Sequence, residues 1–316
     1  MKRFYRRFKN NKLALILGAV LLVALIFFTK GAILDTSGSP VLEQAAGLFS
    51  DKEQDSSDRP SRPVTAGDSL LVQVQDVGQG DSILIQTPTK NVLIDAAEPE
   101  YADTIIQNIR DAGIEQLDLV IATHPHSDHI GGMRKVLESV PTEEILLCPQ
   151  EHTTSTYKKL LKTIEEQEIG VQIAEPGMVL DMGDGAVFNI LGPVQEYKDL
   201  NDASIITRLD FGSKSFLFSG DAEGEAETAT LANGADVDVD VMVAGHHGSS
   251  TSSGDEYLEA ASPEYVAISC GAGNDYGHPH QETLERLEGL TVNRTDLEGS
   301  ITYLCDGETI QVSTEK

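Results

Sequence analysis

Cysteine is scarce in this chain of 316 residues, which contains only three. Cys148, Cys270 and Cys305 stand far apart, and no C-x-x-C spacing occurs. This excludes a cysteine-based zinc knuckle and limits the chain to a single disulfide. Two of the three cysteines follow apolar runs, so buried free thiols are expected.

Basic residues are also few, with 23 Lys and Arg against 51 Asp and Glu, which gives a net charge of −28. Residues 1–62 hold ten basic and six acidic residues, and the remainder holds 13 basic and 45 acidic residues. A globular part with this surplus repels polyanions at long range, which argues against tight non-specific DNA binding. Most of the acidic surface is expected to serve solubility, although a bound metal reverses the sign locally.

Long apolar runs are absent except at 13–28, directly after a segment with six basic residues and no acid. This pattern predicts a signal anchor or transmembrane helix over 13–34, with residues 1–12 in the cytoplasm. The protein is therefore expected at the cell membrane as a single-pass protein with an extracellular domain, or secreted if the signal is cleaved. Ser-, Asp- and Pro-rich sequence predicts a flexible linker over 35–67, followed by one folded domain over 68–316.

Within that domain, short apolar runs bounded by turn residues predict strands over 70–75, 83–86, 92–94, 118–122, 144–148, 187–191, 204–210, 215–218, 239–243 and 265–269. A closing hairpin is predicted over 299–304 and 309–312. Helical spacing predicts helices over 101–111, 132–140, 156–168, 223–232, 254–261 and 281–287. The predicted class is α+β, with two packed sheets and helices on their outer faces.

The chemistry is concentrated at residues 123–132, which read T-H-P-H-S-D-H-I-G-G after an apolar run. His124, His126, Asp128 and His129 fall within six positions, on a loop that a strand would hold still. Neutral imidazole and carboxylate are ligands for zinc, and also for manganese or iron. The stretch therefore predicts a metal site.

Three further groups each follow a predicted strand. Asp221 lies in S-G-D after 215–218, and its two carboxylate oxygens can bridge two cations. His246 and His247 are adjacent after 239–243, so one can ligate a metal while the other faces the substrate. His278, in the turn Y-G-H-P, can contact an anionic group or supply a proton. Loops at strand ends can converge over one edge of a sheet sandwich.

These motifs carry a family resemblance. H-x-H-x-D-H, S-G-D and a distal His resemble the metallo-β-lactamase superfamily. D-V-G-Q-G-D-S at 76–82, H-H-G-S at 246–249, Y-G-H-P at 276–279 and R-T-D-L-E-G at 294–299 resemble the extracellular hydrolase domain of the ComEC/Rec2 competence family, over residues 69–314. The resemblance implies a four-layer αβ/βα sandwich with one or two divalent ions, Zn or Mn. It also implies an exported metal-dependent hydrolase that uses a metal-activated water, with phosphodiester or DNA cleavage the leading activity.

The resemblance also implies metal ligands. His124 and His126 would hold a first ion, Asp128 and His129 a second, and Asp221 would bridge them. His246 would complete the second site.

Catalytic roles follow in the same way. Asp128 would orient the nucleophile, while His247 and His278 would face the scissile group. The order of His246 and His247 stays open, because either can be the ligand.

The chain departs from the family in two respects. No His beyond His152 lies between the cluster and Asp221, so Asn201 or water would fill the first site. A single apolar run replaces the many spans of the competence protein, so this chain cannot itself translocate DNA.

Alternative functions are hydrolysis of a phosphocholine-type or β-lactam-type ester, or metal binding at the surface without catalysis. The expected partners are a phosphoester substrate, with single-stranded DNA among the candidates, and the membrane; no protein partner is indicated.

Overall fold

A computed structural model describes residues 69–316 of the chain. The predicted segments 1–12, 13–34 and 35–67 lie outside the described residues. Within 69–316, no helix combines the length and the apolar character needed to cross a bilayer. The N-terminal anchor therefore stays a prediction from the sequence.

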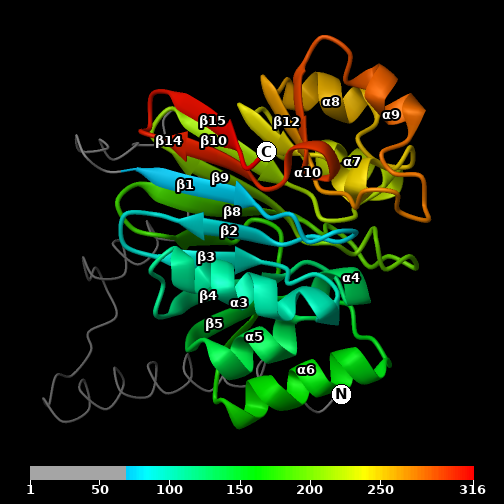
Figure 1. The fold of residues 1–316 in the computed structure, drawn as a ribbon. Helices are drawn as coiled ribbons and strands as arrows, with labels where there is room; N and C mark the ends of the chain where they lie inside the picture. Colours follow the sequence, from blue (N-terminus) through cyan, green and yellow to red (C-terminus); the bar gives the residue numbers. More distant parts are fainter. Residues whose placement is uncertain (1–68) are drawn as a thin grey trace, which may run out of the picture. The chain divides into compact units, whose positions relative to one another are not determined.

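Two sheets form the centre of the described part (Figure 1). The first has eight strands in the order β15-β14-β1-β2-β3-β4-β5-β6, and the second has seven in the order β13-β12-β11-β10-β9-β8-β7. The strands of the first sheet are β1 (Leu70–Val74), β2 (Ile83–Gln86), β3 (Asn91–Ile94), β4 (Leu117–Ala122), β5 (Thr142–Leu147), β6 (Gly170–Ile173), β14 (Ile301–Cys305) and β15 (Ile310–Thr314). Those of the second are β7 (Val179–Asp181), β8 (Ala186–Gly192), β9 (Ile206–Phe211), β10 (Lys214–Phe218), β11 (Val241–Val243), β12 (Tyr265–Ile268) and β13 (Thr291–Arg294).

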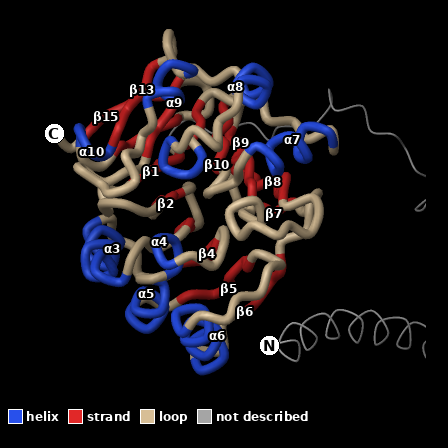
Figure 2. Tube along the Cα trace, turned by 90° about the vertical axis from the view of Figure 1, so that its right-hand side faces the viewer, coloured by secondary structure: helices blue, strands red, loops and turns tan. Residues whose placement is uncertain are grey.

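Helices cover the outer faces of the two sheets, as Figure 2 shows, with α3, α5 and α6 on one side and α7 and α8 on the other. The helices are α3 (Ala102–Asp111), α4 (Ser127–Ile130), α5 (Met133–Ser139), α6 (Ser155–Glu166), α7 (Gly224–Ala232), α8 (Asp255–Ala261), α9 (Gln281–Arg286) and α10 (Thr295–Glu298). Two short 3-10 turns, η1 (Pro99–Tyr101) and η2 (Gly245–Gly248), complete the elements. The predicted arrangement of two sheets flanked by helices is confirmed.

The main core lies between the sheets, because alternate residues of each strand point inward. Val72 and Val74 of β1 join one buried cluster with Phe188, Phe216 and Phe218 of the second sheet, all at most 2% exposed. Burying one such phenyl ring contributes about 1.5–3 kcal/mol relative to leaving it in water. This rigid core holds the strand ends in place.

Three strands were not predicted, namely β6, β7 and β13. Each lies at the edge of a sheet and contains no residue classed as buried. Their place in the sheet depends on backbone pairing with one neighbour, which leaves no alternating apolar pattern to read. The one-turn helices α4 and α10 were also not predicted.

Parallel pairing brings the candidate residues to one edge. β3 pairs in parallel with β4, and β10, β11 and β12 pair in parallel in turn. The carboxyl ends of parallel neighbours meet at the same edge of a sheet. Asp95, His124, Asp221, His246 and Cys270 follow shortly after five of these ends.

Candidate metal centre

The His-rich stretch turns sharply out of β4 into α4. His126, with extended backbone, is the N-cap of α4, and His129 lies on that helix. The glycine pair that follows lets the chain pass close to β3, because a Cβ at Gly132 would run into the backbone oxygen of Ala96. Gly132 N in turn donates to Ala97 O at 2.9 Å. The turn is thereby fixed against the loop after β3.

The second pair of histidines lies on a strained turn. His246 and His247 in η2 have φ of 51° and 56°, in the left-handed region that side chains other than glycine seldom adopt. The turn is held by Gly245 N, which donates to Ser253 Oγ, and by His246 N, which donates to Gly220 O. Such strain costs on the order of 1–3 kcal/mol per residue and persists only where the surroundings enforce it.

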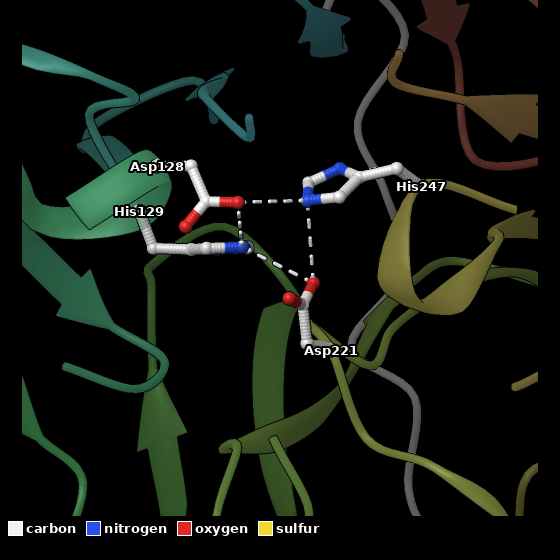
Figure 3. Close-up of side chains that lie close together, drawn as sticks. All are labelled: Asp128, His129, Asp221 and His247. Carbon is white, nitrogen blue, oxygen red and sulfur yellow. Dashed lines mark ion pairs between the residues drawn. The ribbon is translucent and has the colours of Figure 1, made fainter. Parts of the chain in front are cut away.

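Four side chains gather around a single small space, as Figure 3 shows: Asp128, His129, Asp221 and His247. Asp221 Oδ1 lies 3.1 Å from His129 Nε2 and 3.6 Å from His247 Nε2. Asp128 Oδ2 lies 3.4 Å from His247 Nε2 and 4.0 Å from His129 Nε2. Three of the four side chains are buried, and Asp128 borders the solvent.

A second group shares Asp221 through its other oxygen. Asp221 Oδ2 lies 3.6 Å from His124 Nε2, which lies 3.0 Å from His126 Nδ1. His246 is on this side, with Nε2 3.8 Å from Asp221 Oδ2 and Nδ1 3.0 Å from Glu223 Oε1. The structure thus brings all the predicted site residues together around Asp221. It groups His247, rather than the expected His246, with Asp128 and His129.

Buried atoms in the first-described group lack hydrogen-bond partners. His129 Nε2, His247 Nε2 and Asp221 Oδ1 are buried and make no hydrogen bond among the described residues, although Asp221 Oδ1 lies 3.1 Å and 3.6 Å from the two nitrogens. Unpaired buried polar atoms are costly, yet here three of them face one another. Two imidazole nitrogens and two carboxylates at this spacing form a donor set that fits a divalent cation such as zinc or manganese.

Each buried imidazole is held at Nδ1, which leaves Nε2 for a metal. His129 Nδ1 lies 2.7 Å from Asp95 Oδ2, and His247 Nδ1 lies 3.1 Å from Ser269 O and 3.3 Å from Asp81 Oδ1. His124 Nδ1 lies 3.2 Å from Thr123 Oγ1. This is the arrangement by which outer partners orient metal-binding histidines.

The supporting carboxylates Asp81 and Asp95 were not among the residues predicted from the sequence. Asp95 follows the end of β3, so the strand-end rule that found Asp221 could have found it. Asp81 lies in the D-V-G-Q-G-D-S motif, which supported the family resemblance but predicted no role for this residue. With His129 they form a third group of closely spaced donor atoms. Asp95 is already occupied by Thr123 N and Thr123 Oγ1, at 2.9 and 2.5 Å, so it serves to position His129.

The carboxylates polarise the site strongly. Burial alone disfavours the imidazolium of His247, but Asp221 and Asp81 outweigh it and raise its pKa to about 10. The pKa of His129 rises well above its usual range for the same reason, with Asp221, Asp95 and Asp128 overcoming burial. The pKa of Asp221 falls well below its usual range, because His129, His247 and His124 outweigh its burial. The centre therefore attracts positive charge, and protons and cations compete for the same nitrogens.

A cavity of about 370 Å³ opens beside these groups. It is lined by Gln79, Glu98, His126, Ser127, Asp128, Asn201, Asp221, His246, His247, Tyr276 and His278. Asn201 Oδ1 is buried and has no hydrogen-bond partner within residues 69–316, while Asn201 Nδ2 donates to Glu223 Oε1 at 3.3 Å. An amide oxygen is thus available where the sequence lacks a third histidine.

Gln79 orients His278 at the cavity wall. Gln79 Oε1 accepts from Gly271 N at 3.1 Å, so its Nε2 must donate to His278 Nδ1, 3.3 Å away. His278 then carries its proton on Nε2. Burial and the neighbouring His247 and His246 lower the pKa of His278 to about 4, which keeps the ring neutral at pH 7.

Comparison with known proteins agrees with this geometry. The family described as the Metallo-beta-lactamase superfamily matches residues 75–272. ComE operon protein 3 of Bacillus subtilis is 30% identical over 73% of this chain, and Competence protein ComA of Neisseria gonorrhoeae is 32% identical over 73%. The matched region spans 32% of each of these relatives, so the chain covers about a third of their length.

Among solved structures, the metallo-beta-lactamase fold protein YhfI from Bacillus subtilis superposes with a TM-score of 0.50 at 14% identity. The match covers 75% of this chain and 100% of YhfI. This likeness concerns the fold alone, and it agrees with the two sheets and their flanking helices. The family match extends over most of the described domain and includes the His cluster, Asp221 and the His246–His247 turn. The chain belongs to the metallo-β-lactamase superfamily.

Proposed function

We propose that this protein is an exported, metal-dependent phosphodiesterase anchored in the cell membrane by its N-terminal segment. The observation that carries the proposal is the sharing of Asp221 by two groups of donor atoms, one through each carboxylate oxygen. Metallo-β-lactamase proteins are generally metal-dependent hydrolases, and a bridged pair of cations suits displacement at phosphorus. The names of the competence relatives favour a phosphoester in DNA over other esters.

His124, His126 and Asp221 would hold the first ion of the proposed pair. Asn201 Oδ1 would supply a further contact, because it has no hydrogen-bond partner among the described residues and lines the same cavity. His246, on this side of Asp221 and exposed at 22% of its side chain, faces the substrate.

Asp128, His129, Asp221 and His247 would hold the second ion. His247 takes the place expected for His246, because its side chain is only 1% exposed and its Nε2 faces both carboxylates. The exchange of the two histidines follows from the left-handed turn, which points the adjacent rings in different directions.

Bound cations would lower the pKa of a water molecule toward about 7 and stabilise the negative charge that develops on the phosphoester. Asp128 lies at the cavity wall with its carboxylate partly exposed, so it can accept a hydrogen bond from the attacking water and orient it. His278 lines the cavity and carries its proton on Nε2, so it could donate a hydrogen bond to a non-bridging phosphate oxygen. No Lys or Arg lines the described cavity, so the chain's own donors there are neutral or titratable.

Turnover of bis-p-nitrophenyl phosphate by the full chain loaded with Zn or Mn tests the proposal. Nitrocefin and a phosphocholine ester serve as competing substrates. Asp128→Ala is expected to abolish phosphodiester turnover while leaving thermal unfolding of the metal-free protein unchanged. Asp103→Ala is the matched control, because Asp103 is exposed and pairs with Lys135 on the helix side. Full activity in Asp128→Ala, or hydrolysis of nitrocefin alone, would exclude the proposed reaction.

A further inference from the structure

Tyr276 is an exposed aromatic residue at the rim of the catalytic cavity. Its exposed fraction is 67%, and within residues 69–316 only Val179, Leu297 and Leu304 are other large apolar residues exposed in this way. Of these four, Tyr276 alone lines the cavity beside Asp221. An exposed aromatic ring beside the cavity can contact a bound substrate directly, and the metal site itself does not require it.

The backbone of Tyr276 is fixed on both sides. Its N–H donates to Asn274 Oδ1 at 3.1 Å, and its carbonyl lies 3.2 Å from His280 Nε2. Asn274 Oδ1 also accepts from His278 N, while its Nδ2 donates to His278 O at 2.6 Å. The backbone that carries the ring is therefore already ordered before a ligand binds, which favours affinity.

The ring is placed within reach of the reacting centre. Tyr276 stacks on His278, with ring centroids 5.7 Å apart and planes inclined by 24°. The His278 ring lies 5.4 Å from that of His246 and 6.2 Å from that of His247. One face of the tyrosine is thus supported by His278, and its exposed surface is available to a planar group near the cavity.

The charge around the cavity favours such a contact. No Lys or Arg lines the described cavity, and the sequence beyond residue 62 holds 45 acidic against 13 basic residues. Ion pairs with phosphates, which dominate the affinity of most nucleic-acid-binding proteins, are therefore not available at the rim. Stacking on an aromatic side chain needs no positive charge and suits every base.

We propose that Tyr276 forms a stacking subsite for a nucleobase joined to the phosphodiester that is cleaved. This rests on the proposed function and adds to it the substrate class, a nucleotide phosphodiester recognised by its base. The subsite selects substrates by an aromatic ring beside the reacting phosphate and has little dependence on the length of the polymer.

Binding tests the subsite without turnover. The full chain loaded with Mn is titrated calorimetrically with thymidine 5′-monophosphate and with methyl phosphate, which lacks the base. Tyr276→Ala is expected to weaken binding of the nucleotide by about tenfold or more relative to methyl phosphate, and Tyr276→Phe to retain it. Leu297→Ala, which removes another exposed apolar side chain away from the cavity, is the control. Equal affinity of wild type and Tyr276→Ala for the nucleotide overturns the proposal.

Turnover provides the second arm. Thymidine 5′-(p-nitrophenyl phosphate) and methyl p-nitrophenyl phosphate share a leaving group and differ in the base. In Tyr276→Ala the ratio of kcat/KM for the thymidine ester to that for the methyl ester is expected to fall about tenfold, mainly through KM. An equal fall of kcat/KM for both esters would mean that Tyr276 only supports the structure of its loop, and this result would overturn the proposed subsite. If the wild type hydrolyses neither ester, the proposed function fails, and the calorimetric comparison still decides on stacking.

Discussion

Asp95→Asn separates the orientation of a metal-binding histidine from the integrity of the fold. Asp95 Oδ2 lies 2.7 Å from His129 Nδ1, while Oδ1 accepts from Thr123 N at 2.9 Å. In the amide, Oδ1 can keep the contact with Thr123 N, but an NH₂ group replaces Oδ2. That group donates to His129 Nδ1 and drives the imidazole proton to Nε2, the atom nearest Asp221 Oδ1. Asp95 has φ of 57°, which Asn also tolerates, so the backbone is expected to stay unchanged.

The expected effect is a loss of metal affinity. Changing an outer partner of a metal-bound histidine weakens binding by about 10–100-fold, or about 1.4–2.7 kcal/mol. The metal-free protein is expected to lose less stability than this, because burial raises the pKa of the Asp95 carboxyl and so offsets part of what its pairing with His129 contributes. A neutral amide in that place removes the cost of a buried charge.

Calorimetric titration with Zn or Mn measures the affinity, and thermal unfolding with and without metal measures the linked stabilisation. Asp118→Asn makes the same chemical change near the start of β4, where Asp118 Oδ2 accepts from Asn91 N at 2.8 Å. It is expected to bind metal like the wild type. If Asp95→Asn also binds metal like the wild type while Asp221→Asn has lost binding, the positioning role of Asp95 is refuted.

Three further predictions concern the supports of the site. Because His246 has φ of 51°, His246→Gly is expected to be more stable than His246→Ala by about 1 kcal/mol in urea unfolding; equal stabilities would show that the turn is not strained. Burial raises the pKa of Glu227 from 4.5 to about 7. The folded state therefore holds a proton that the unfolded chain has released, and stability falls as pH rises through this window, by up to about 3 kcal/mol. Glu227→Gln should lack this dependence. Equal shifts of the urea midpoint with pH in the wild type and in Glu227→Gln would contradict the prediction. Finally, Gln79→Glu offers His278 Nδ1 an acceptor in place of a donor, so its proton should move from Nε2 to Nδ1, visible in ¹⁵N shifts of labelled histidine. Loss of the Nε2–H should lower kcat by about tenfold or more with little change in KM; an unchanged tautomer would remove Gln79 from this role.

The sequence determined which residue types carry the chemistry and where they stand along the chain. Apolar runs such as 119–122 and 215–218 are buried in strands, so their ends could be recognised by the polar residues that follow. His124, His126, Asp128 and His129 fall within six positions at the turn from β4 into α4, so local geometry is enough to hold them together. Edge strands such as β7 could not be predicted, because their side chains are largely exposed and show no apolar periodicity.

Only the tertiary structure decided how distant segments complete the site. Asp95 supports His129 through a hydrogen bond, and Asp81 lies 3.3 Å from His247 Nδ1; both contacts join different loops, which no local pattern encodes. The places of His246 and His247 depend on a left-handed turn that Ser253 and Gly220 hold from outside the motif. The sequence alone shows that two adjacent imidazoles, those of His246 and His247, follow a strand. Which of them joins Asp128 and His129 depends on backbone dihedral angles that packing enforces against their intrinsic preference.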